Sequence, residues 1–306
     1  MELQIQPLPF DPARLNGLSE RLLTSHHRNN YGGAVNRLNA IRKQLQWETA
    51  PGFAINGLKR EELIAANSMW LHELYFGGLG GNGELAPGGL SVALARDFGS
   101  VARWRDEFIA LGRAMAGGSG WALLAWSARE ARLVNQWAAD HTHLLAGATP
   151  LLALDMYEHA YHIDYGSNAA AYIDAFMSHI DWQVIGERYV AALEADAHAW
   201  QLSADELAAQ RAHYDVLDVR RDAPFKAAPD MIEGATWADP THVNAWAGDL
   251  PAGRKVVVYC VYGHEVCQST AAVLRARGID ARFLEGGIVK WKEEGRPVQP
   301  KGEASS

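Results

Sequence analysis

Apolar residues recur at helical spacing through the first two thirds of the chain, and the pattern changes near residue 200. Short β-rich runs then follow at 214–219, 256–259 and 281–284, and they alternate with helical segments rich in Ala and Leu. Such alternation is typical of a parallel α/β sheet. The pattern therefore predicts two folds, one mainly helical and one α/β, with a boundary near 200–212.

Glycine interrupts the first of these folds. Residues 77–89 hold seven glycines and a proline, so no helix can run through this stretch. We expect a helical hairpin in residues 1–84 and a mixed α/β part in residues 85–200. A polar helical connector at 201–212 is expected to lead into the second fold at 213–302.

Composition and charge narrow the class of protein. A chain of 306 residues that is 48% hydrophobic is long enough for two cores and is not a disordered chain. The net charge of −8 argues against nucleic acid as a partner, because binding to phosphate backbones needs a basic surface. Only two cysteines occur, Cys260 and Cys267, which excludes a disulfide framework and favours a reducing compartment. No stretch approaches the roughly 18 apolar residues of a membrane span, and the first residues show no leader pattern, so we expect no membrane partner and a cytoplasmic location.

Histidines and one aspartate suggest a metal site in the first fold. The apolar run 151–154 ends in Asp155, and His159 follows four residues later. A carboxylate and an imidazole at the end of a buried run are costly unless something compensates them, and a metal ion is one such compensation. His26 and His72 lie in helical segments with apolar neighbours. Three imidazoles and one carboxylate suit iron, manganese or zinc, and their spacing does not choose among these metals.

These segments resemble the iron/manganese superoxide dismutase family. The resemblance also rests on four short motifs, which are Leu8-Pro9-Phe10, Asp97-Phe98-Gly99-Ser100, Gly118-Ser119-Gly120-Trp121 and Asp181-Trp182. It implies a helical hairpin followed by an α/β (α+β) part, and conversion of superoxide to oxygen and hydrogen peroxide. It also implies one Fe or Mn per subunit, held by His26, His72, Asp155 and His159. Zinc is excluded by this activity, because the metal must cycle between two oxidation states.

The resemblance assigns further roles around the metal. Each turnover needs two protons, which the family supplies through a solvent molecule held by an outer residue, usually Gln. One family position for this Gln falls at Ser68, which is too short, so we expect His141 to take the role. His143 is the alternative, and a third reading is that both histidines merely face solvent. Arg188 matches the arginine of the positive funnel that attracts superoxide, and Glu158 matches the residue that reaches a ligand histidine of the opposite subunit, which implies a homodimer.

The sequence departs from the family at four positions near the expected site. The family's gateway tyrosine falls at Ala34, and Tyr157 replaces the tryptophan of the ligand motif. Asn30 and His162 stand where the family has a His and a Tyr that pair across the dimer, so this hydrogen bond can survive with its roles exchanged. The departures bear on rate, proton delivery and metal preference, and they leave the four ligands intact. A His in place of the outer Gln slightly favours iron over manganese.

The second fold carries a cysteine at the end of a strand. The run 256–259 ends at Cys260, and a loop containing Gly263 leads into a helix that we expect to reach Ala276. A Cys in this place faces backbone N–H groups, which favour the thiolate and bound anions. The placement resembles rhodanese, an α/β domain with a parallel sheet. Further matches are Asp218-Val219-Arg220, Gly234-Ala235, the run 284–288 and Trp291.

The rhodanese resemblance implies that Cys260 is a nucleophile that carries sulfane sulfur as a persulfide, received from a sulfane-sulfur donor. Glu265 stands where cationic or polar residues are common, so a domain that only binds is the alternative. Cys267 either resolves an oxidised Cys260 as an intramolecular disulfide or is a buried small residue.

Three functions remain to be compared. The first is a homodimeric superoxide dismutase with an appended sulfur-handling domain. The second is a sulfurtransferase or persulfide carrier whose first domain is a structural, metal-binding dimeriser. Replacement of Cys260 by Ser separates these two, because sulfur transfer depends on the thiol and dismutation does not. The third is a redox-sensing interaction protein without turnover.

Overall fold

The structure is a computed structural model that describes residues 2–46, 51–195, 200–250 and 253–301. The chain forms two compact units whose sequences interleave. Residues 1–85, 105–125 and 134–185 make the first unit, and residues 86–104, 126–133 and 186–306 make the second. These units do not follow the change of composition near residue 200, and the domain boundaries expected from composition stay a prediction.

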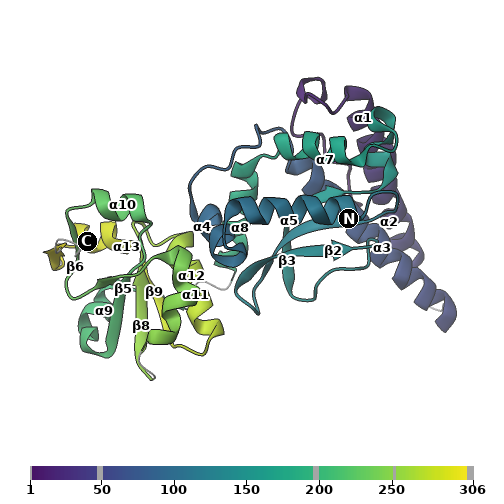
Figure 1. The fold of residues 1–306 in the computed structure, drawn as a ribbon. Coiled ribbons are helices and arrows are strands. Elements are labelled where there is room, and N and C mark those ends of the chain that lie inside the picture. The colour runs from purple at the N-terminus through teal and green to yellow at the C-terminus, as the bar shows by residue number, and fades with distance from the viewer. Residues whose placement is uncertain (1, 47–50, 196–199, 251–252, 302–306) are drawn as a thin grey trace. The chain divides into compact units, whose positions relative to one another are not determined.

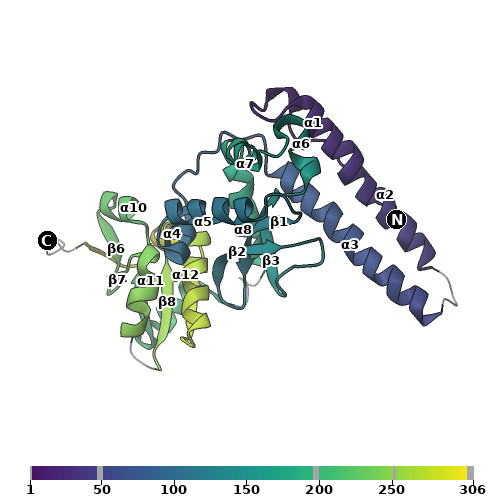
Figure 2. The same cartoon turned by 45° about the vertical axis from the view of Figure 1, so that its right-hand side comes forward.

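A long helical hairpin belongs to the first unit (Figure 1). After the short helix η1 (Pro12–Arg14), its first arm runs through α1 (Glu20–Ser25), the π-helical segment η2 (His26–Tyr31) and α2 (Gly32–Gln44). Its second arm is α3 (Gly52–Gly77), which returns beside α2 (Figure 2). The Ser19 hydroxyl caps the first arm by accepting from the backbone N–H of Leu22. A helical hairpin, as the expected fold class requires, is therefore present.

Helices and a three-stranded sheet follow the hairpin. The strands are β1 (Trp121–Ser127), β2 (Arg132–Ala138) and β3 (Ala148–Asp155), in the order β2-β1-β3. All seven residues of β1 are buried, and β3 is buried from Leu151 to its end. The helices are α4 (Gly89–Phe98), α5 (Val101–Ala114), η3 (Glu158–Ala160), α6 (His162–Tyr165), α7 (Ala169–Ser178) and α8 (Trp182–Glu194).

The glycine-rich stretch passes very close to another part of the backbone. α3 ends at Gly77 and α4 begins at Gly89, so the stretch between them is not helical. A Cβ atom at Gly81 would lie 2.4 Å from the carbonyl oxygen of Ile180, and one at Gly83 would lie 2.7 Å from that of Met177. Residues with side chains cannot fit there, which explains these two glycines.

The second unit contains a five-stranded parallel sheet. Its strands are β4 (Gln201–Leu202), β5 (Tyr214–Asp218), β7 (Thr236–Trp237), β8 (Lys255–Tyr259) and β9 (Ala281–Leu284), in the order β4-β9-β8-β5-β7. Val257 of β8 pairs with Val216 of β5 and with Arg282 of β9. Two further strands, β6 (Asp230–Ile232) and β10 (Val298–Pro300), pair antiparallel. The three β-rich runs expected from the sequence are thus strands of one parallel sheet.

Helices alternate with these strands along the chain. They are α9 (Ala204–Ala209), η5 (Arg211–His213), α10 (Asp222–Ala227), η6 (Pro240–His242), α11 (Val243–Trp246), η7 (Ala247–Asp249), α12 (Glu265–Ala276) and α13 (Gly287–Glu293). Of these, α12 packs against β8 and β9. Val257 and Tyr259 share a buried cluster with Leu207 of α9 and Trp291 of α13. Because successive side chains of a strand point to opposite faces, Val258 points to the other face.

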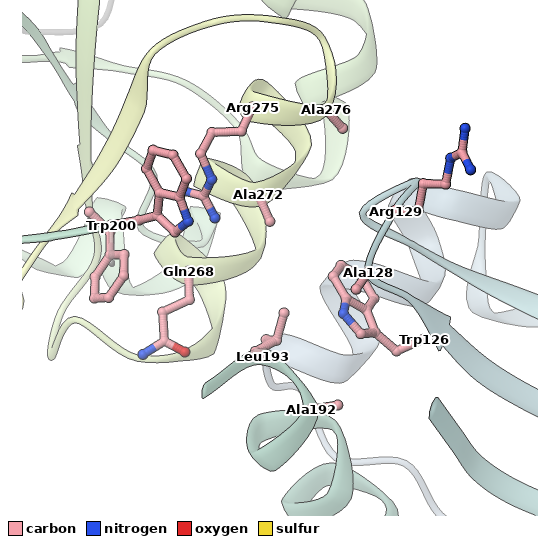
Figure 3. A pocket seen from close by; sticks show the side chains of 11 residues that line it. Trp126, Ala128, Arg129, Ala192, Leu193, Trp200, Gln268, Ala272, Arg275 and Ala276 are labelled. Atoms are coloured by element: carbon pink, nitrogen blue, oxygen red, sulfur yellow. The ribbon is translucent and has the colours of Figure 1, made fainter. Parts of the chain in front are cut away.

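The predicted connector at 201–212 is not only a connector. It does contain a capped helix, α9, but Leu202 of β4 pairs with Leu284 of β9, which makes β4 an edge strand of the parallel sheet. Leu202 and Leu207 are both buried in the core of this sheet. Just before β4, the Arg275 guanidinium lies over the Trp200 ring, 4.6 Å from its centre (Figure 3). This segment is therefore part of the α/β fold.

The fold class expected from the sequence is confirmed. A helical region precedes an α/β part, and the C-terminal third holds a parallel sheet. Among the described helices, none has the length and the apolar character needed to cross a membrane.

Candidate metal centre and cysteine loop

The structure brings together the four residues predicted as metal ligands. His26, His72, Asp155 and His159 each offer one ligand atom, and these atoms all lie within 4.8 Å of one another. Oδ2 of Asp155 lies at the centre of the group, 3.1 Å from Nε2 of His26, 3.1 Å from Nε2 of His159 and 3.5 Å from Nε2 of His72. Three of the residues are buried, whereas the His159 side chain keeps 27% of its surface exposed.

Each ligand candidate comes from a different element of the first unit. His26 is the first residue of the π-helical segment, and His72 lies on α3. Asp155 ends the buried strand β3, and His159 lies in the single turn η3 that follows. A π-helical turn inside a longer helix is uncommon and is often found at functional sites. Here it begins at a residue of the metal group.

Hydrogen bonds orient two of these side chains. Nδ1 of His72 donates to the backbone carbonyl of Ser68 at 2.6 Å, so Nε2 of His72 is the nitrogen without a proton. Among the described residues, that buried Nε2 atom has no hydrogen-bond partner. The Tyr157 backbone N–H donates to Oδ1 of Asp155, which turns Oδ2 toward the histidines.

Burial sets the charge of the group. It lowers the pKa of His72 to about 3 and lowers the pKa of His26, so both imidazoles are neutral at pH 7. Burial opposes the charged form of Asp155, but the neighbouring His159 and His26 outweigh it and lower the pKa of this carboxyl. Neutral imidazole nitrogens around a carboxylate are the donor set of a divalent transition-metal ion. The unpartnered Nε2 of His72 fits such an ion, because a buried polar atom without a partner is costly.

His141 lies beside this group. The ring N–H of the buried Trp121 donates to Nδ1 of His141 at 3.0 Å, so the proton of neutral His141 is on Nε2. The His141 ring stacks on Tyr157 with 5.1 Å between ring centres, and Tyr157 stacks on His159 at 5.3 Å. The ring centre of His72 is 6.4 Å from that of His141. Burial lowers the pKa of His141, which keeps it neutral.

The sequence did not reveal the partners of His141. Trp121 belongs to one of the motifs of the resemblance, but no role was assigned to it. Nδ2 of Asn67 donates to the His141 backbone carbonyl at 2.5 Å and fixes the turn after β2. Asn67 shares one face of α3 with Leu71, four positions later. This helical spacing does not indicate a contact with the distant His141.

The other predicted residues are placed differently. His143 is exposed, and its Nδ1 lies 3.1 Å from Oδ1 of Asp140, so it is not oriented by the metal group. The Ser68 hydroxyl is 3.5 Å from Nδ1 of His72 and adds to the shell around that ligand. Glu158 is exposed, and Arg188 lies partly buried on α8 in the second unit. The roles expected for Arg188 and Glu158 stay predictions.

The four departures from the family pattern are also visible. Ala34 is buried on α2, so no phenol occupies its position. Tyr157 supplies the ring that lies between His141 and His159. Asn30 is partly buried and His162 is exposed.

The predicted cysteine loop of the second unit holds both cysteines of the chain. Cys260 follows β8, and Cys267 lies in the first turn of α12. Their sulfur atoms are 3.4 Å apart, and both residues are buried. Backbone N–H groups of Ile288 and Val289 donate to the carbonyl oxygens of Cys260 and Val261, which fastens the start of α13 to the loop.

The Cys260 thiol is activated. The Cys267 thiol and the backbone N–H groups of Cys267, Tyr262 and Gly263 outweigh burial and lower the pKa of Cys260 to about 6. Burial raises the pKa of Cys267 well above its usual value. At pH 7 the loop therefore holds a thiolate at Cys260 beside a thiol at Cys267.

Known proteins resemble both parts of the chain. A family model for the C-terminal domain of iron/manganese superoxide dismutases matches residues 86–188, and a rhodanese-like domain model matches residues 203–294. The chain is 61% identical over 196 residues to the superoxide dismutase [Fe] of Cupriavidus metallidurans, a match that covers 63% of this chain and 99% of that protein. It is 34% identical to the superoxide dismutase [Fe] of Aquifex aeolicus, with coverage of 63% and 94%. It is also 34% identical to superoxide dismutase [Mn] 1 of Halobacterium salinarum, with coverage of 63% and 98%. The chain therefore belongs to the iron/manganese superoxide dismutase family and carries a rhodanese-like domain at residues 203–294.

Proposed function

We propose that the protein is a superoxide dismutase that converts two superoxide ions and two protons to oxygen and hydrogen peroxide, with an appended sulfur-handling domain. The observation that carries this proposal is the buried group of three histidines and one aspartate, whose ligand atoms lie within 4.8 Å of one another. The match to 99% of an iron superoxide dismutase supports it.

His26, His72, Asp155 and His159 would hold one iron or manganese ion per subunit. When bound, the metal supplies one-electron redox chemistry, which none of these side chains can supply. Asp155 contributes the negative charge that favours a divalent cation, and the neutral His26 and His72 contribute nitrogen ligands. We favour iron, because the relative that is 61% identical is named as an iron enzyme.

His141 would handle the protons of the reaction. Because Trp121 donates to Nδ1, neutral His141 can donate only from Nε2. From Nε2 it can hold, by a hydrogen bond, the solvent molecule that carries the protons, and that molecule can exchange with bulk water because His141 is only partly buried. The stack through Tyr157 holds the ring in this orientation.

Arg188 and Glu158 would act on substrate capture and assembly. Superoxide is an anion and the chain has a net charge of −8, so a local positive charge such as Arg188 would speed its capture. We propose a homodimer in which the exposed Glu158 reaches a ligand histidine of the second subunit. We also propose a cytoplasmic location for the protein.

A second candidate function rests on the Cys260 thiolate. A cysteine whose pKa is lowered by backbone N–H groups suits the role of a sulfur nucleophile. It would accept sulfane sulfur from a donor and carry it as a persulfide. In this alternative the metal group serves only to stabilise a dimer. Replacement of Cys260 by Ser separates the two functions, because it would abolish sulfur transfer and would not affect dismutation.

The test is superoxide dismutation per bound metal, measured on protein reconstituted separately with iron and with manganese. His72→Ala is the blank, because it removes a ligand. His143→Ala is the matched control, because it removes an exposed imidazole. Turnover in the unaltered chain and in His143→Ala, but not in His72→Ala, supports the proposal. No turnover with either metal refutes it and leaves the cysteine loop as the functional site.

The role of His141 has its own test. His141→Ala should lower turnover by about 10- to 100-fold while the bound metal is retained, because loss of the outer residue that holds the solvent molecule costs about that much. His143→Ala should leave turnover unchanged. Equal turnover in the two variants would mean that His141 has no part in proton transfer.

A further inference from the structure

The two cysteines of the chain meet in the rhodanese-like domain. Their sulfur atoms lie 3.4 Å apart, and they are the only cysteines in the sequence. We propose that hydrogen peroxide oxidises Cys260 and that Cys267 then closes an intramolecular disulfide, which makes the loop a reversible peroxide switch.

The loop gives the two sulfur atoms different access. Cys260 keeps 6% of its surface exposed at the end of β8, so a molecule as small as hydrogen peroxide can reach it. Cys267 is fully buried in the first turn of α12 and cannot meet an oxidant first. Cys260 is therefore oxidised first, and Cys267 reacts with it second.

The electrostatics support the same order. Donors from the loop lower the pKa of Cys260 to about 6, so it is a thiolate at pH 7, and only the thiolate attacks peroxide. Burial keeps the pKa of Cys267 high, so it still carries its proton. The Cys267 thiol has two acceptors within reach, because its sulfur is 3.2 Å from the His264 carbonyl oxygen and 3.4 Å from the Cys260 sulfur.

The chemistry balances without any other oxidant. The Cys260 thiolate attacks one oxygen of hydrogen peroxide, an S–O bond forms, the O–O bond breaks, and the second oxygen leaves as water after taking a proton. Cys260 is thereby oxidised by two electrons to a sulfenic acid, and the peroxide is reduced. The Cys267 sulfur then attacks the Cys260 sulfur, the S–O bond breaks, and the hydroxide leaves as water with the Cys267 proton. Two thiols and one hydrogen peroxide give one disulfide and two waters.

The switch would connect the two parts of the chain through a product. Hydrogen peroxide, the oxidant of the switch, is also a product of the proposed dismutation. The source of the oxidant therefore rests on the proposed function. The disulfide step itself needs only peroxide from any source. While the disulfide is closed, the Cys260 sulfur cannot accept sulfane sulfur, and it is protected from further oxidation. A dithiol reductant would reopen it by exchange.

Intact-mass spectrometry of the metal-loaded, full-length protein tests the switch. After reduction and treatment with one equivalent of hydrogen peroxide, we expect a loss of about 2 Da and a fall of free thiols from two per chain to none, both reversed by dithiothreitol. With only two cysteines, the mass assigns the pair without ambiguity. Cys267→Ser should instead hold Cys260 as a sulfenic acid that dimedone traps, and Cys260→Ser should show neither product.

Two results would overturn the switch. One is a wild-type chain that gains only oxygen atoms on a single cysteine. The other is a disulfide that joins two chains, which doubles the mass on a non-reducing gel. Because these readings come from the unaltered protein, a variant that fails to fold does not affect them.

The His72→Ala variant separates this proposal from the dismutase proposal. It should lose dismutation and still form the disulfide with added peroxide. Disulfide formation in a protein that shows no dismutation with either metal would refute the dismutase proposal alone. Dismutation without disulfide formation would refute the switch alone.

Discussion

Removal of the Cys267 thiol should raise the pKa of Cys260. This thiol is the largest of the influences that lower that pKa to about 6, and its sulfur is 3.4 Å from the Cys260 sulfur. A hydrogen bond to a charged group contributes about 1.5–3 kcal/mol. At 1.36 kcal/mol per pKa unit, loss of the bond in Cys267→Ala should raise the pKa by about 1–2 units, to roughly 7–8.

The rate of alkylation against pH measures this change. At pH 6 about half of the wild-type Cys260 is thiolate, whereas a pKa of roughly 7–8 leaves about 1–9%. Alkylation by iodoacetamide at pH 6 should therefore slow about 5- to 50-fold in Cys267→Ala, and the difference should nearly vanish at pH 9. The wild-type rate should rise through a midpoint at about pH 6 and level off about one pH unit higher, where nearly all of the Cys260 is thiolate. Peptide mass spectrometry reports Cys260 separately from Cys267.

A matched variant checks the cause. Cys267→Ser keeps an O–H donor beside Cys260, so the midpoint of its pH profile should stay closer to 6 than that of Cys267→Ala. A midpoint near 6 in Cys267→Ala would refute the reasoning. The backbone N–H groups of Tyr262 and Gly263 would then be sufficient to stabilise the thiolate.

Three further predictions concern the metal group, the core and the loop. Asp155→Ala should reduce bound iron or manganese from one per subunit to near zero by elemental analysis, because it removes the only carboxylate of the group. Asp218→Ala should lower the free energy of unfolding by about 3–5 kcal/mol in urea, because it leaves the buried Arg220 guanidinium without the carboxylate to which it donates. Gly287→Ala should also destabilise the protein in urea, by more than about 1–2 kcal/mol, because this residue has φ +58° and its Cβ would lie 2.5 Å from the Cys260 carbonyl oxygen. Unchanged metal content would contradict the first of these predictions, and an unchanged unfolding midpoint in urea would contradict the second or the third.

Parts of this architecture were predictable from local sequence. The run 151–154 indicated a buried strand that delivers Asp155 and His159, and β3 does end at Asp155. The run 256–259 likewise indicated a strand that delivers Cys260 to a helix start, and β8 and α12 have this arrangement. In both cases the signal is local, because a strand and the residue after it lie within a few positions of each other.

Contacts between distant residues were not predictable from the pattern. The hydrogen bond from Trp121 to His141 joins the start of β1 to the turn after β2, and no periodicity encodes it. The π-helical segment at 26–31 shifts the helical register at a ligand, although the spacing fits an ordinary α-helix. Residues 201–202 were counted with the helical connector, because a two-residue edge strand is too short to show alternation.

The two sites solve the same physical problem in different ways. Each holds a buried anion, the Asp155 carboxylate in one and the Cys260 thiolate in the other, and a buried anion persists only where something compensates its charge. Around Asp155 the neighbouring His159 and His26 lower the pKa of the carboxyl, and burial keeps the imidazoles of His26 and His72 neutral, so the group has the donor set for a cation. Around Cys260 the backbone N–H groups and the Cys267 thiol compensate the charge without a cation. The first arrangement therefore requires a metal ion for its chemistry, whereas the second is ready to react with peroxide or sulfane sulfur as the chain folds.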